Sequence, residues 1–325
     1  MSTCKVSVCI PTYNYGNYIA ETIESVLNQS FSDFELLIID DCSNDHTRAI
    51  VESYAKRDPR IRFITNEVNL GMVENWNSCL LQAKGEYIKF VFGDDLLASP
   101  DAIGRMVSLL DDSSSISLVC SARNLINESS QTLKIESHFK SGVMAGTDTI
   151  NNCLVCQQNL IGEPSVVMFR KSQAGRGFQT NYQQIVDLEM WFHLLEQGSF
   201  AYINEPLCSF RIHGQQQTAK NKESHSHLKD FVYLVSDYLH KDYIKQSYFM
   251  KKYIQYDALY GFWKLYKKNI ITREVALELI SINCNFSFLA WYPLYKSFKP
   301  FYKQYRKIFS NRLKASSRGD HIESV

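Results

Sequence analysis

Apolar positions along the first part of the chain follow two alternating periods. Short runs dominated by apolar residues predict strands, of which the run at 35–40 reads as buried on both faces. Stretches with apolar residues three or four positions apart predict helices. The predicted strands cover residues 6–11, 35–40, 61–65, 86–92 and 118–122, and the predicted helices cover residues 18–29, 45–54, 71–83 and 100–110. Strands separated by helices predict an α/β fold, in which a mostly parallel sheet has helices on both faces as an α/β/α sandwich.

The pattern changes in the second half of the chain. From about residue 127 the periodicity weakens, with helices predicted at 147–160 and 184–197 and strands at 165–170 and 207–212. Beyond residue 220 the chain reads as helical and is rich in Tyr, Phe and Lys. We therefore predict a domain over residues 1–218, with halves 1–125 and 126–218, and a helical C-terminal extension over residues 219–325.

Composition narrows the class of protein. The 325 residues are 45% hydrophobic and 21% charged, which predicts a packed core rather than disorder. A net charge of +1 argues against a general nucleic-acid binder, so we expect no nucleic-acid partner. The chain shows no signal-peptide pattern and no long uninterrupted apolar segment, which predicts a cytoplasmic location.

Nine cysteines are scattered without a regular framework, and reduced thiols are the expectation for such a chain. Cys153 and Cys156 form a lone Cys-x-x-Cys. A zinc site needs a second pair of ligands, and none stands at a suitable spacing. Buried small apolar side chains are the favoured interpretation, with zinc binding or redox chemistry as the alternative.

Polar residues gather where the predicted strands end. Tyr13 and Asn14 follow the first strand, the pair Asp40-Asp41 ends the second, and the pair Asp94-Asp95 follows the fourth. Ligands of open α/β sheets bind beyond the carboxyl ends of the strands. An aromatic ring and four carboxylates are therefore expected to line one crevice.

Adjacent carboxylates repel each other unless a positive charge lies nearby. Mg²⁺ or Mn²⁺ commonly binds through one or two carboxylates together with substrate phosphates, so Asp94-Asp95 is a candidate metal site. The alternative is that one aspartate caps a turn and the other is solvated. For Asp40-Asp41 the turn is the stronger alternative, because Ser43 and Asn44 follow.

Several nucleotide-binding and hydrolase motifs are missing. The sequence contains no Walker A motif, no G-x-G-x-x-G after the first strand and no G-x-S-x-G elbow. These absences argue against a P-loop ATPase, a dinucleotide-binding Rossmann domain and an α/β hydrolase. The expected ligand is therefore not held by a glycine-rich phosphate loop.

A series of short motifs resembles the opening of the family 2 inverting glycosyltransferases. They are VSVCIPTYN at 6–14, IESVLNQS at 23–30, residues 36–45, Asn69-Leu-Gly71, Asn77, AKGEYI at 83–88 and Gly93-Asp94-Asp95. The resemblance extends more loosely to about His213. It implies an A-type glycosyltransferase fold, with a nucleotide-binding half at 1–125 and an acceptor-binding half at 126–218.

The resemblance implies a donor site for a nucleotide-diphosphate sugar. Tyr13 would stack on the base and Asp41 would hydrogen-bond it, while Asn77 is expected to be structural. Base stacking of this kind is worth about 1–3 kcal/mol. The residues implied in donor binding are Pro11, Tyr13, Asn14, Asp40, Asp41, Asn69, Gly71, Asp94 and Arg211.

The same resemblance implies a divalent metal, Mn²⁺ or Mg²⁺. Asp95 is the first choice of ligand, with Asp94 toward the ribose or the metal. His213 would either touch the diphosphate or complete the metal shell. The family usually has a carboxylate at the first position of this motif, and here Gly93 stands there. Arg211 is expected to pair either with phosphate or with a buried carboxylate.

The general base of the family lies at the start of a helix in the second half. Residues 186–191, VDLEMW, match that segment, which implies Asp187 as the base that accepts the acceptor's proton. Glu189 is the alternative, and Glu163 is a candidate contact to the acceptor. The chain lacks the Q-x-x-R-W run of processive synthases, so a single sugar transfer is expected.

The C-terminal region combines basic and aromatic residues. Residues 279–319 contain no Asp or Glu. Such a composition suits an anionic membrane surface, which predicts peripheral attachment to the inner face of the cytoplasmic membrane and a lipid-linked glycan acceptor, as in O-antigen and related surface polysaccharide synthesis. The alternative is a helical appendage that packs on the rest of the chain.

Two other functions compete with transfer. One is a catalytically silent sugar-nucleotide-binding or scaffold protein of the same fold, against which the joint presence of Asp95 and Asp187 argues. The other is a nucleotidyltransferase that makes activated sugars. That enzyme class carries a glycine-rich, basic loop after the first strand, and residues 11–18 do not form one.

Overall fold

A computed structural model describes residues 4–214, 216, 226–274 and 288–315 of the chain. The chain divides into two compact units. The first, here called the sheet unit, comprises Met1–Gly146, Ile161–Asn181 and Val186–Gly214. The second, the helical unit, comprises Thr147–Leu160, Tyr182–Ile185 and Gln215–Val325. The predicted boundary between residues 218 and 219 lies outside the described residues.

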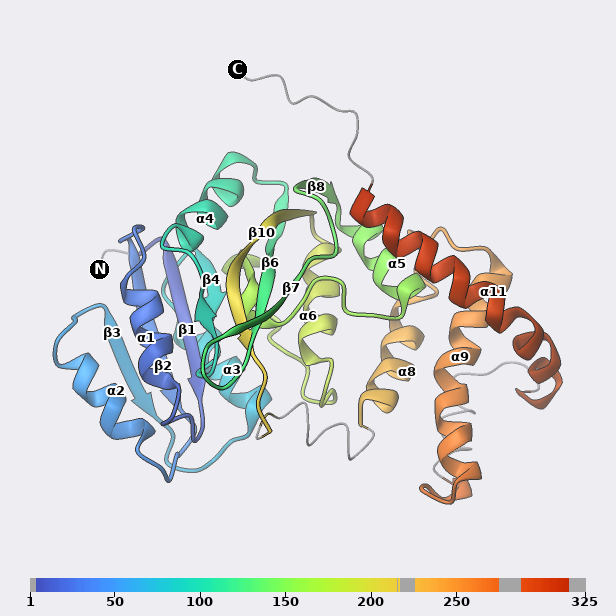
Figure 1. Ribbon diagram of the computed structural model, residues 1–325, viewed down its shortest axis with the longest axis horizontal. Coiled ribbons are helices and arrows are strands. Elements are labelled where there is room, and N and C mark those ends of the chain that lie inside the picture. The colour runs from blue at the N-terminus through green and yellow to red at the C-terminus, as the bar shows by residue number, and fades with distance from the viewer. Residues whose placement is uncertain (1–3, 215, 217–225, 275–287, 316–325) are drawn as a thin grey trace. The chain divides into compact units, whose positions relative to one another are not determined.

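One mixed sheet forms the centre of the sheet unit (Figure 1). Its strands lie in the order β3-β2-β1-β4-β9-β6-β10-β5, with β7 paired to β6 and β8 paired to β10. β1, β2, β3 and β4 are mutually parallel neighbours, as are β6 and β10. The strand bounds are β1 (Val6–Thr12), β2 (Phe34–Asp40), β3 (Ile61–Thr65), β4 (Tyr87–Phe90), β5 (Leu96–Leu97), β6 (Ile116–Ile126), β7 (Thr132–Glu136), β8 (Gly142–Ala145), β9 (Val167–Arg170) and β10 (Ser199–Arg211).

Helices flank this sheet and bury their apolar sides. They are α1 (Ile19–Leu27), α2 (Thr47–Ala55), α3 (Met72–Gln82), α4 (Ala102–Asp112) and α6 (Val186–Leu195). In α1 the buried residues are Ile19, Thr22, Ile23 and Val26, which follow the helical spacing seen in the sequence. The predicted α/β class, with a mostly parallel sheet and flanking helices, is confirmed.

The sheet extends beyond the strands that were predicted. β10 begins at Ser199, well before the predicted start at residue 207, and shifts register between Ile203 and Pro206 and again before Cys208. The sequence Asn204-Glu205-Pro206 at this irregularity reads as a turn, because proline cannot donate to a ladder. β7 and β8 are largely exposed, so they lack the apolar run that marks a buried strand.

The helical unit contains most of α5 (Gly146–Cys156) together with α8 (Ser226–Tyr238), α9 (Tyr248–Lys267) and α11 (Phe288–Ala315). Tyr295 and Tyr302 of α11 are buried, and the Tyr302 hydroxyl donates to the Val155 carbonyl at 2.6 Å. Cys153 and Cys156 are buried, and neither forms a disulfide. Within the described residues, no helix is both long and apolar enough to span a membrane.

The predicted basic and aromatic region is only partly described. Residues 279–287 and 316–319, including Arg318, lie outside the described residues. In α11 the aromatic rings divide between two environments, because Tyr295 and Tyr302 are buried while Phe301 is 68% exposed. One part of the helix therefore packs in its own unit and another part faces solvent.

Candidate active site

The acidic pair after β4 is buried and its two members have different partners. Asp95 is fully buried, and its carboxylate accepts hydrogen bonds from the Ser165 hydroxyl at 2.5 Å and the Arg211 backbone N–H at 3.0 Å. Burial, reinforced by the negative charge of Asp94, raises the pKa of Asp95 well above its usual range. Both oxygens of Asp95 therefore serve as acceptors within the protein.

Asp94 pairs with the histidine that follows β10. Its Oδ2 lies 2.9 Å from Nε2 of His213, and both side chains are almost completely buried. The ring of Tyr18 packs against His213 with centroids 5.0 Å apart. Asp94 and His213, two of the three predicted metal ligands, are thus in contact.

Gly93 stands where the family usually has a carboxylate, and the structure gives a steric reason for its presence. A Cβ at this position would lie 2.8 Å from Cδ2 of Tyr15 and 3.1 Å from the Thr12 hydroxyl. The ring of Tyr15 occupies the space that a side chain at position 93 needs. Burial and the two aspartates raise the pKa of Tyr15 well above its usual value.

Arg211 is fully buried and contacts both residues of the acidic pair. Its Nε donates to the Asp94 carbonyl at 2.8 Å, and Nη2 donates to Glu21 Oε2 at 2.7 Å. Nη1 donates to carbonyls of Asn127 and Glu128 and to the Ser130 hydroxyl. Of the two predicted roles, this geometry favours pairing with a carboxylate, because these donors are already directed at protein acceptors. The carboxylate, that of Glu21, is 53% exposed rather than buried as expected.

The pair after β2 organises two loops. Asp41 is buried, and its carboxylate accepts from the backbone N–H groups of Leu70 at 2.8 Å and Gly71 at 2.9 Å, and from Asn66 Nδ2 at 2.8 Å. Asn69 donates to the Asp41 carbonyl at 3.0 Å. Asp41, Asn69 and Gly71 are thus brought together, as the motif predicts.

Asp40 forms the capped turn that the sequence left open as an alternative. The Ser43 N–H donates to Asp40 Oδ2 at 3.1 Å, and the Ser43 hydroxyl donates to Oδ1. Burial raises the pKa of Asp40, although the bonds from Ser43 oppose the shift. Asp40 therefore fixes the loop that follows β2.

The loop after β1 presents an exposed ring. Pro11 is buried within β1, whereas Tyr13 is 45% exposed. Asn14 has φ of 57°, its side-chain oxygen accepts from the Asn44 N–H, and its backbone N–H donates to Ser43 Oγ. These bonds join the loops after β1 and β2, so Tyr13 is held beside the Asp40–Asp41 turn.

Asp187 lies in the first turn of α6 and is only 9% exposed. Burial, and to a smaller extent the negative charge of Glu163, raise its pKa to about 7, while Arg123 opposes the shift. Glu163 also raises the pKa of Asp95, so Glu163 lies within electrostatic reach of both sites. A carboxylate with this pKa accepts and releases a proton near neutral pH.

A buried arginine holds Glu163 in place. Arg123 forms ion pairs with Glu163 at 3.1 Å and Glu136 at 2.7 Å. Gly162 has φ of 117°, and a Cβ there would lie 2.7 Å from Nη1 of Arg123. The glycine therefore leaves room for the guanidinium beside Glu163.

Glu189, the alternative base, has a structural partner. Arg176 donates two hydrogen bonds of 2.8 Å to the two oxygens of Glu189, whose side chain is 5% exposed. A bidentate pair of this kind fixes both groups. Asn77, predicted to be structural, exchanges hydrogen bonds with the backbone of Phe178 at 2.7 and 3.0 Å.

The donor set at the acidic pair fits a hard divalent cation that keeps open coordination positions. Asp94 and His213 are adjacent and offer a carboxylate oxygen and an imidazole nitrogen. Within the described residues, no group of three or more His, Cys, Asp or Glu side chains is arranged for a metal. The protein would supply two ligands, and phosphate oxygens and water would supply the others.

Sequence reasoning missed several residues of this region. Ser165, Arg123, Tyr15 and Glu21 contact the acidic pair or its neighbours, yet none belongs to a motif that marks it. Ser165 follows the Gly162-Glu163-Pro164 turn, and its position before β9 was the one available signal. The others are brought in by long-range packing, which a single sequence does not reveal.

Comparison with known proteins assigns the chain to a family. Residues 7–174 match the family described as Glycosyl transferase family 2. The putative teichuronic acid biosynthesis glycosyltransferase TuaG of Bacillus subtilis is 31% identical over 72% of this chain and 89% of its own. The chondroitin synthase of Escherichia coli is 29% identical over 68% of this chain, but the match spans 31% of that protein.

Solved structures resemble the whole chain. TarS of S. aureus, residues 1–349 in complex with UDP-GlcNAc, aligns with a TM-score of 0.65 and 18% identity over 98% of this chain and 95% of that one. The mannosyltransferase PcManGT of Pyrobaculum calidifontis, in complex with GDP-Man and Mn²⁺, aligns with a TM-score of 0.57 and 17% identity over 98% of this chain and 89% of that one. At these identities the likeness establishes the fold.

Proposed function

The chain belongs to glycosyltransferase family 2, and from this premise we propose that it transfers one sugar from a nucleotide diphosphate to a glycan hydroxyl with inversion. The observation that carries the proposal is Asp187, a buried carboxylate with a pKa raised to about 7. It lies in the same unit as the Asp94–His213 pair, and Glu163 is in electrostatic reach of both sites.

The donor nucleotide is proposed to bind at the loops after β1 and β2. The exposed ring of Tyr13 is suited to stacking on a base, and Asn14 and Asp40 hold the loop that presents it. Pro11, Asp41, Asn69 and Gly71 are proposed to shape the floor of this site. TarS in complex with UDP-GlcNAc and PcManGT in complex with GDP-Man share the fold, which supports a nucleotide-sugar donor.

The diphosphate is proposed to bind near the acidic pair, together with Mn²⁺ or Mg²⁺. Asp94 and His213 would hold the cation, which stabilises negative charge on a diphosphate leaving group. Asp95 is proposed to hold the site in place without binding the cation, through the hydrogen bonds that it accepts from Ser165 and the backbone N–H of Arg211. Arg211 orients the pair through the Asp94 carbonyl.

The acceptor's proton is proposed to move to Asp187. As the acceptor oxygen forms a bond to the anomeric carbon, its O–H proton passes to the Asp187 carboxylate. The bond from the anomeric carbon to the diphosphate oxygen breaks on the opposite side, and the nucleoside diphosphate leaves with that electron pair. Displacement from the opposite side inverts the anomeric centre.

The acceptor is proposed to be a lipid-linked glycan of bacterial surface polysaccharide synthesis, met at the inner face of the cytoplasmic membrane. The relative named for teichuronic acid biosynthesis and the exposed basic and aromatic side of α11 support this assignment. A silent protein of the same fold would bind the donor without turnover.

Release of nucleoside diphosphate from a panel of UDP-, GDP-, CDP- and dTDP-sugars tests the proposal. Wild type should turn over one donor in the presence of Mn²⁺ and a glycan acceptor, and Asp187→Asn should bind that donor equally but turn it over about 10²–10⁴-fold more slowly. The anomeric configuration of the product, read by NMR, should be inverted. Equal turnover by Asp187→Asn, or a retained configuration, would contradict the mechanism.

A further inference from the structure

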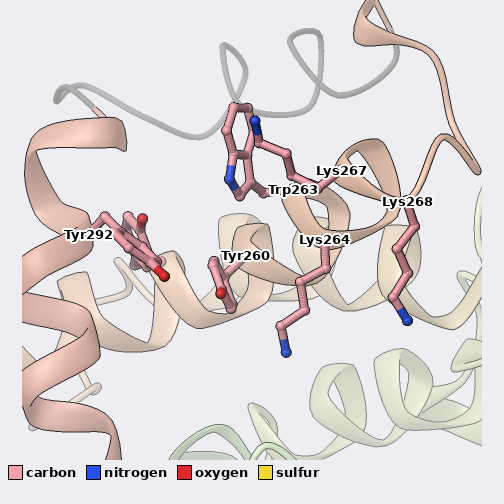
Figure 2. A pocket seen from close by; sticks show the side chains of 7 residues that line it. Tyr260, Trp263, Lys264, Lys267, Lys268 and Tyr292 are labelled. Atoms are coloured by element: carbon pink, nitrogen blue, oxygen red, sulfur yellow. The ribbon is translucent and has the colours of Figure 1, made fainter.

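A pocket in the helical unit combines aromatic rings with lysines (Figure 2). Its volume is about 690 Å³, which is in the range of small-molecule sites. The lining residues come from α9, from the residue that caps its C-terminus and from α11, within one compact unit. They are Tyr256, Tyr260, Trp263, Lys264, Lys267, Lys268 and Tyr292.

Two of the lining rings come from different helices and lie next to each other. Tyr292 projects from α11 toward Tyr260 on α9, with ring centroids 5.9 Å apart and planes inclined by 30° (Figure 2). Tyr292 is 38% exposed, and Tyr260 and Trp263 are half-buried. Partly exposed rings fixed by packing present an apolar surface with polar edges.

The lysines supply positive charge that no acid of the described residues offsets. Lys264, Lys267 and Lys268 are exposed, and none of them forms an ion pair within the described part of the chain. The nearby carboxylate of Asp257 already accepts from the Tyr295 hydroxyl and pairs with Lys299 at 3.6 Å. Burial lowers the pKa of Lys299, and the positive charge of Lys264 lowers it further.

A simpler account explains only part of this arrangement. Lysines are favourable in the last turn of a helix, where they oppose the helix dipole, and Lys264 and Lys267 lie in the last turn of α9. They also lie over rings, with Lys264 Nζ 4.9 Å from the Tyr260 centroid and Lys267 Nζ 5.1 Å from that of Trp263. Neither effect accounts for an open pocket between rings contributed by two helices.

We propose that this pocket binds an anionic saccharide. Sugar rings present apolar C–H faces that pack on Tyr260, Trp263 and Tyr292, and carboxylate or phosphate substituents pair with Lys264, Lys267 and Lys268. The pocket belongs to the helical unit, whereas the donor and base residues belong to the sheet unit. We take this saccharide to be part of the glycan acceptor, and that identification rests on the proposed function. The binding of an anionic saccharide to the pocket does not depend on it.

Calorimetric titration of the full chain with hexagalacturonate tests the proposal. Wild type should bind it, and Lys264→Gln/Lys267→Gln should bind about tenfold or more weakly, a loss of about 1.4 kcal/mol. The matched control is Lys307→Gln/Lys314→Gln, which removes the same charge from exposed positions of α11 and should bind as wild type does. Tyr292→Ala, at an exposed position, should also weaken binding.

Three further probes separate the possible ligands. Neutral maltohexaose and inorganic pyrophosphate should each bind more weakly than hexagalacturonate, because each offers half of the required chemistry. The proposal would be overturned if wild type bound pyrophosphate as tightly as hexagalacturonate. It would also be overturned if the Lys264→Gln/Lys267→Gln variant bound both ligands as tightly as wild type does. Binding of equal-parts phosphatidylglycerol–phosphatidylcholine vesicles that is lost in this variant, with no saccharide bound, would assign the pocket to the membrane and overturn it too.

Nucleotide binding distinguishes failure of this proposal from failure of the proposed function. The Lys264→Gln/Lys267→Gln variant should bind a nucleoside diphosphate as wild type does. A protein that binds a nucleoside diphosphate but no anionic saccharide contradicts the pocket alone. One that binds the saccharide but no nucleotide contradicts the donor site alone.

Discussion

The carboxylate of Asp187 determines the expected pH dependence of the reaction. A base must be deprotonated to accept a proton, and burial has raised the pKa of Asp187 to about 7. We therefore expect kcat/KM to rise with pH up to about 7 and then level, with a loss of about tenfold per pH unit on the acid side. A pH–rate profile that is flat between pH 5 and pH 8 would contradict the assignment.

The burial of Asp187 also makes the stability of the protein depend on pH. The pKa of Asp187 is about 7 in the folded state and near 3.8 in its usual range, so folding favours the protonated form. The contribution of the protonated Asp187 carboxyl group to the free energy of unfolding is therefore fully present below about pH 4 and is lost as the pH rises through 7. Asp187→Asn should raise the free energy of unfolding at pH 8 by up to about 4 kcal/mol.

Thermal denaturation of Asp187→Asn and wild type at pH 4 and pH 8 measures this effect. The difference in Tm should be larger at pH 8 than at pH 4. A variant that is less stable than wild type at pH 8 would show that the carboxylate is stabilised by its surroundings, contrary to the structure.

Glu163 adjusts Asp187 from a neighbouring position. Its negative charge raises the pKa of Asp187, so Glu163→Gln should move the acid limb of the kcat/KM profile to lower pH. Arg105→Gln, which breaks an exposed ion pair with Glu205, serves as a control and should leave the limb unchanged. A Glu163→Gln profile that superimposes on the wild-type profile would remove Glu163 from this role.

The sequence identified some residues of the candidate site but not how they contact one another. Asp94, Asp95, Asp187 and His213 could be found because short motifs or strand ends mark them. The sequence ranked Asp95 above Asp94 as a ligand, while the geometry puts Asp94 against His213 and directs both oxygens of Asp95 at protein donors. That difference depends on Ser165, which is distant in the sequence from both aspartates.

At the scale of elements, α3 depends on the glycine that precedes it. Gly71 caps α3 with φ of 87° and ψ of 165°, a conformation that is essentially restricted to glycine. Gly71→Ala should lower the free energy of unfolding by about 1–3 kcal/mol and weaken nucleotide binding, because Gly71 donates to Asp41.

Gly175→Ala is the matched control for this change. A Cβ added at Gly175 would have no atom within 4 Å, and φ of Gly175 is not positive, so the substitution should be close to neutral. Urea denaturation of both variants makes the comparison. Equal stability of the two would contradict a conformational requirement at Gly71.

Buried strands were predicted well, and irregular or exposed strands were not. β1, β2 and β3 lie within one residue of their predicted ranges. β1 and β2 are short runs that are buried throughout, whereas β3 is an edge strand that is only partly buried. β5, β7 and β8 were not predicted, because each is very short or exposed and is held by pairing with a distant strand. Register and pairing of this kind are set by the tertiary structure.

At the scale of the whole molecule, the exposed aromatic and basic residues of α11 predict binding to anionic membranes. Phe301 is 68% exposed and Tyr305 is 40% exposed, with Lys307 and Lys314 also exposed on this helix. Interfacial aromatic rings and basic residues together favour an anionic surface, at about 1 kcal/mol per basic residue.

Co-sedimentation with phosphatidylglycerol vesicles measures this prediction. Wild type should co-sediment in low salt, and Lys307→Gln/Lys314→Gln should bind less, whereas Lys264→Gln/Lys267→Gln should bind as wild type does. Salt should weaken the interaction because the surface charges are screened. Absence of wild-type binding in low salt would leave α11 with a packing role alone.

The donor site is the central claim, and calorimetric binding of UDP, GDP, CDP and dTDP tests it most directly. Each nucleotide is titrated with Mn²⁺ or with a chelator into wild type, Asp94→Asn and Asp187→Asn. We expect one nucleotide to bind wild type with Mn²⁺, to bind at least about tenfold more weakly with chelator or with Asp94→Asn, and to bind Asp187→Asn unchanged. A folded wild-type protein that binds none of the four nucleotides would contradict the account.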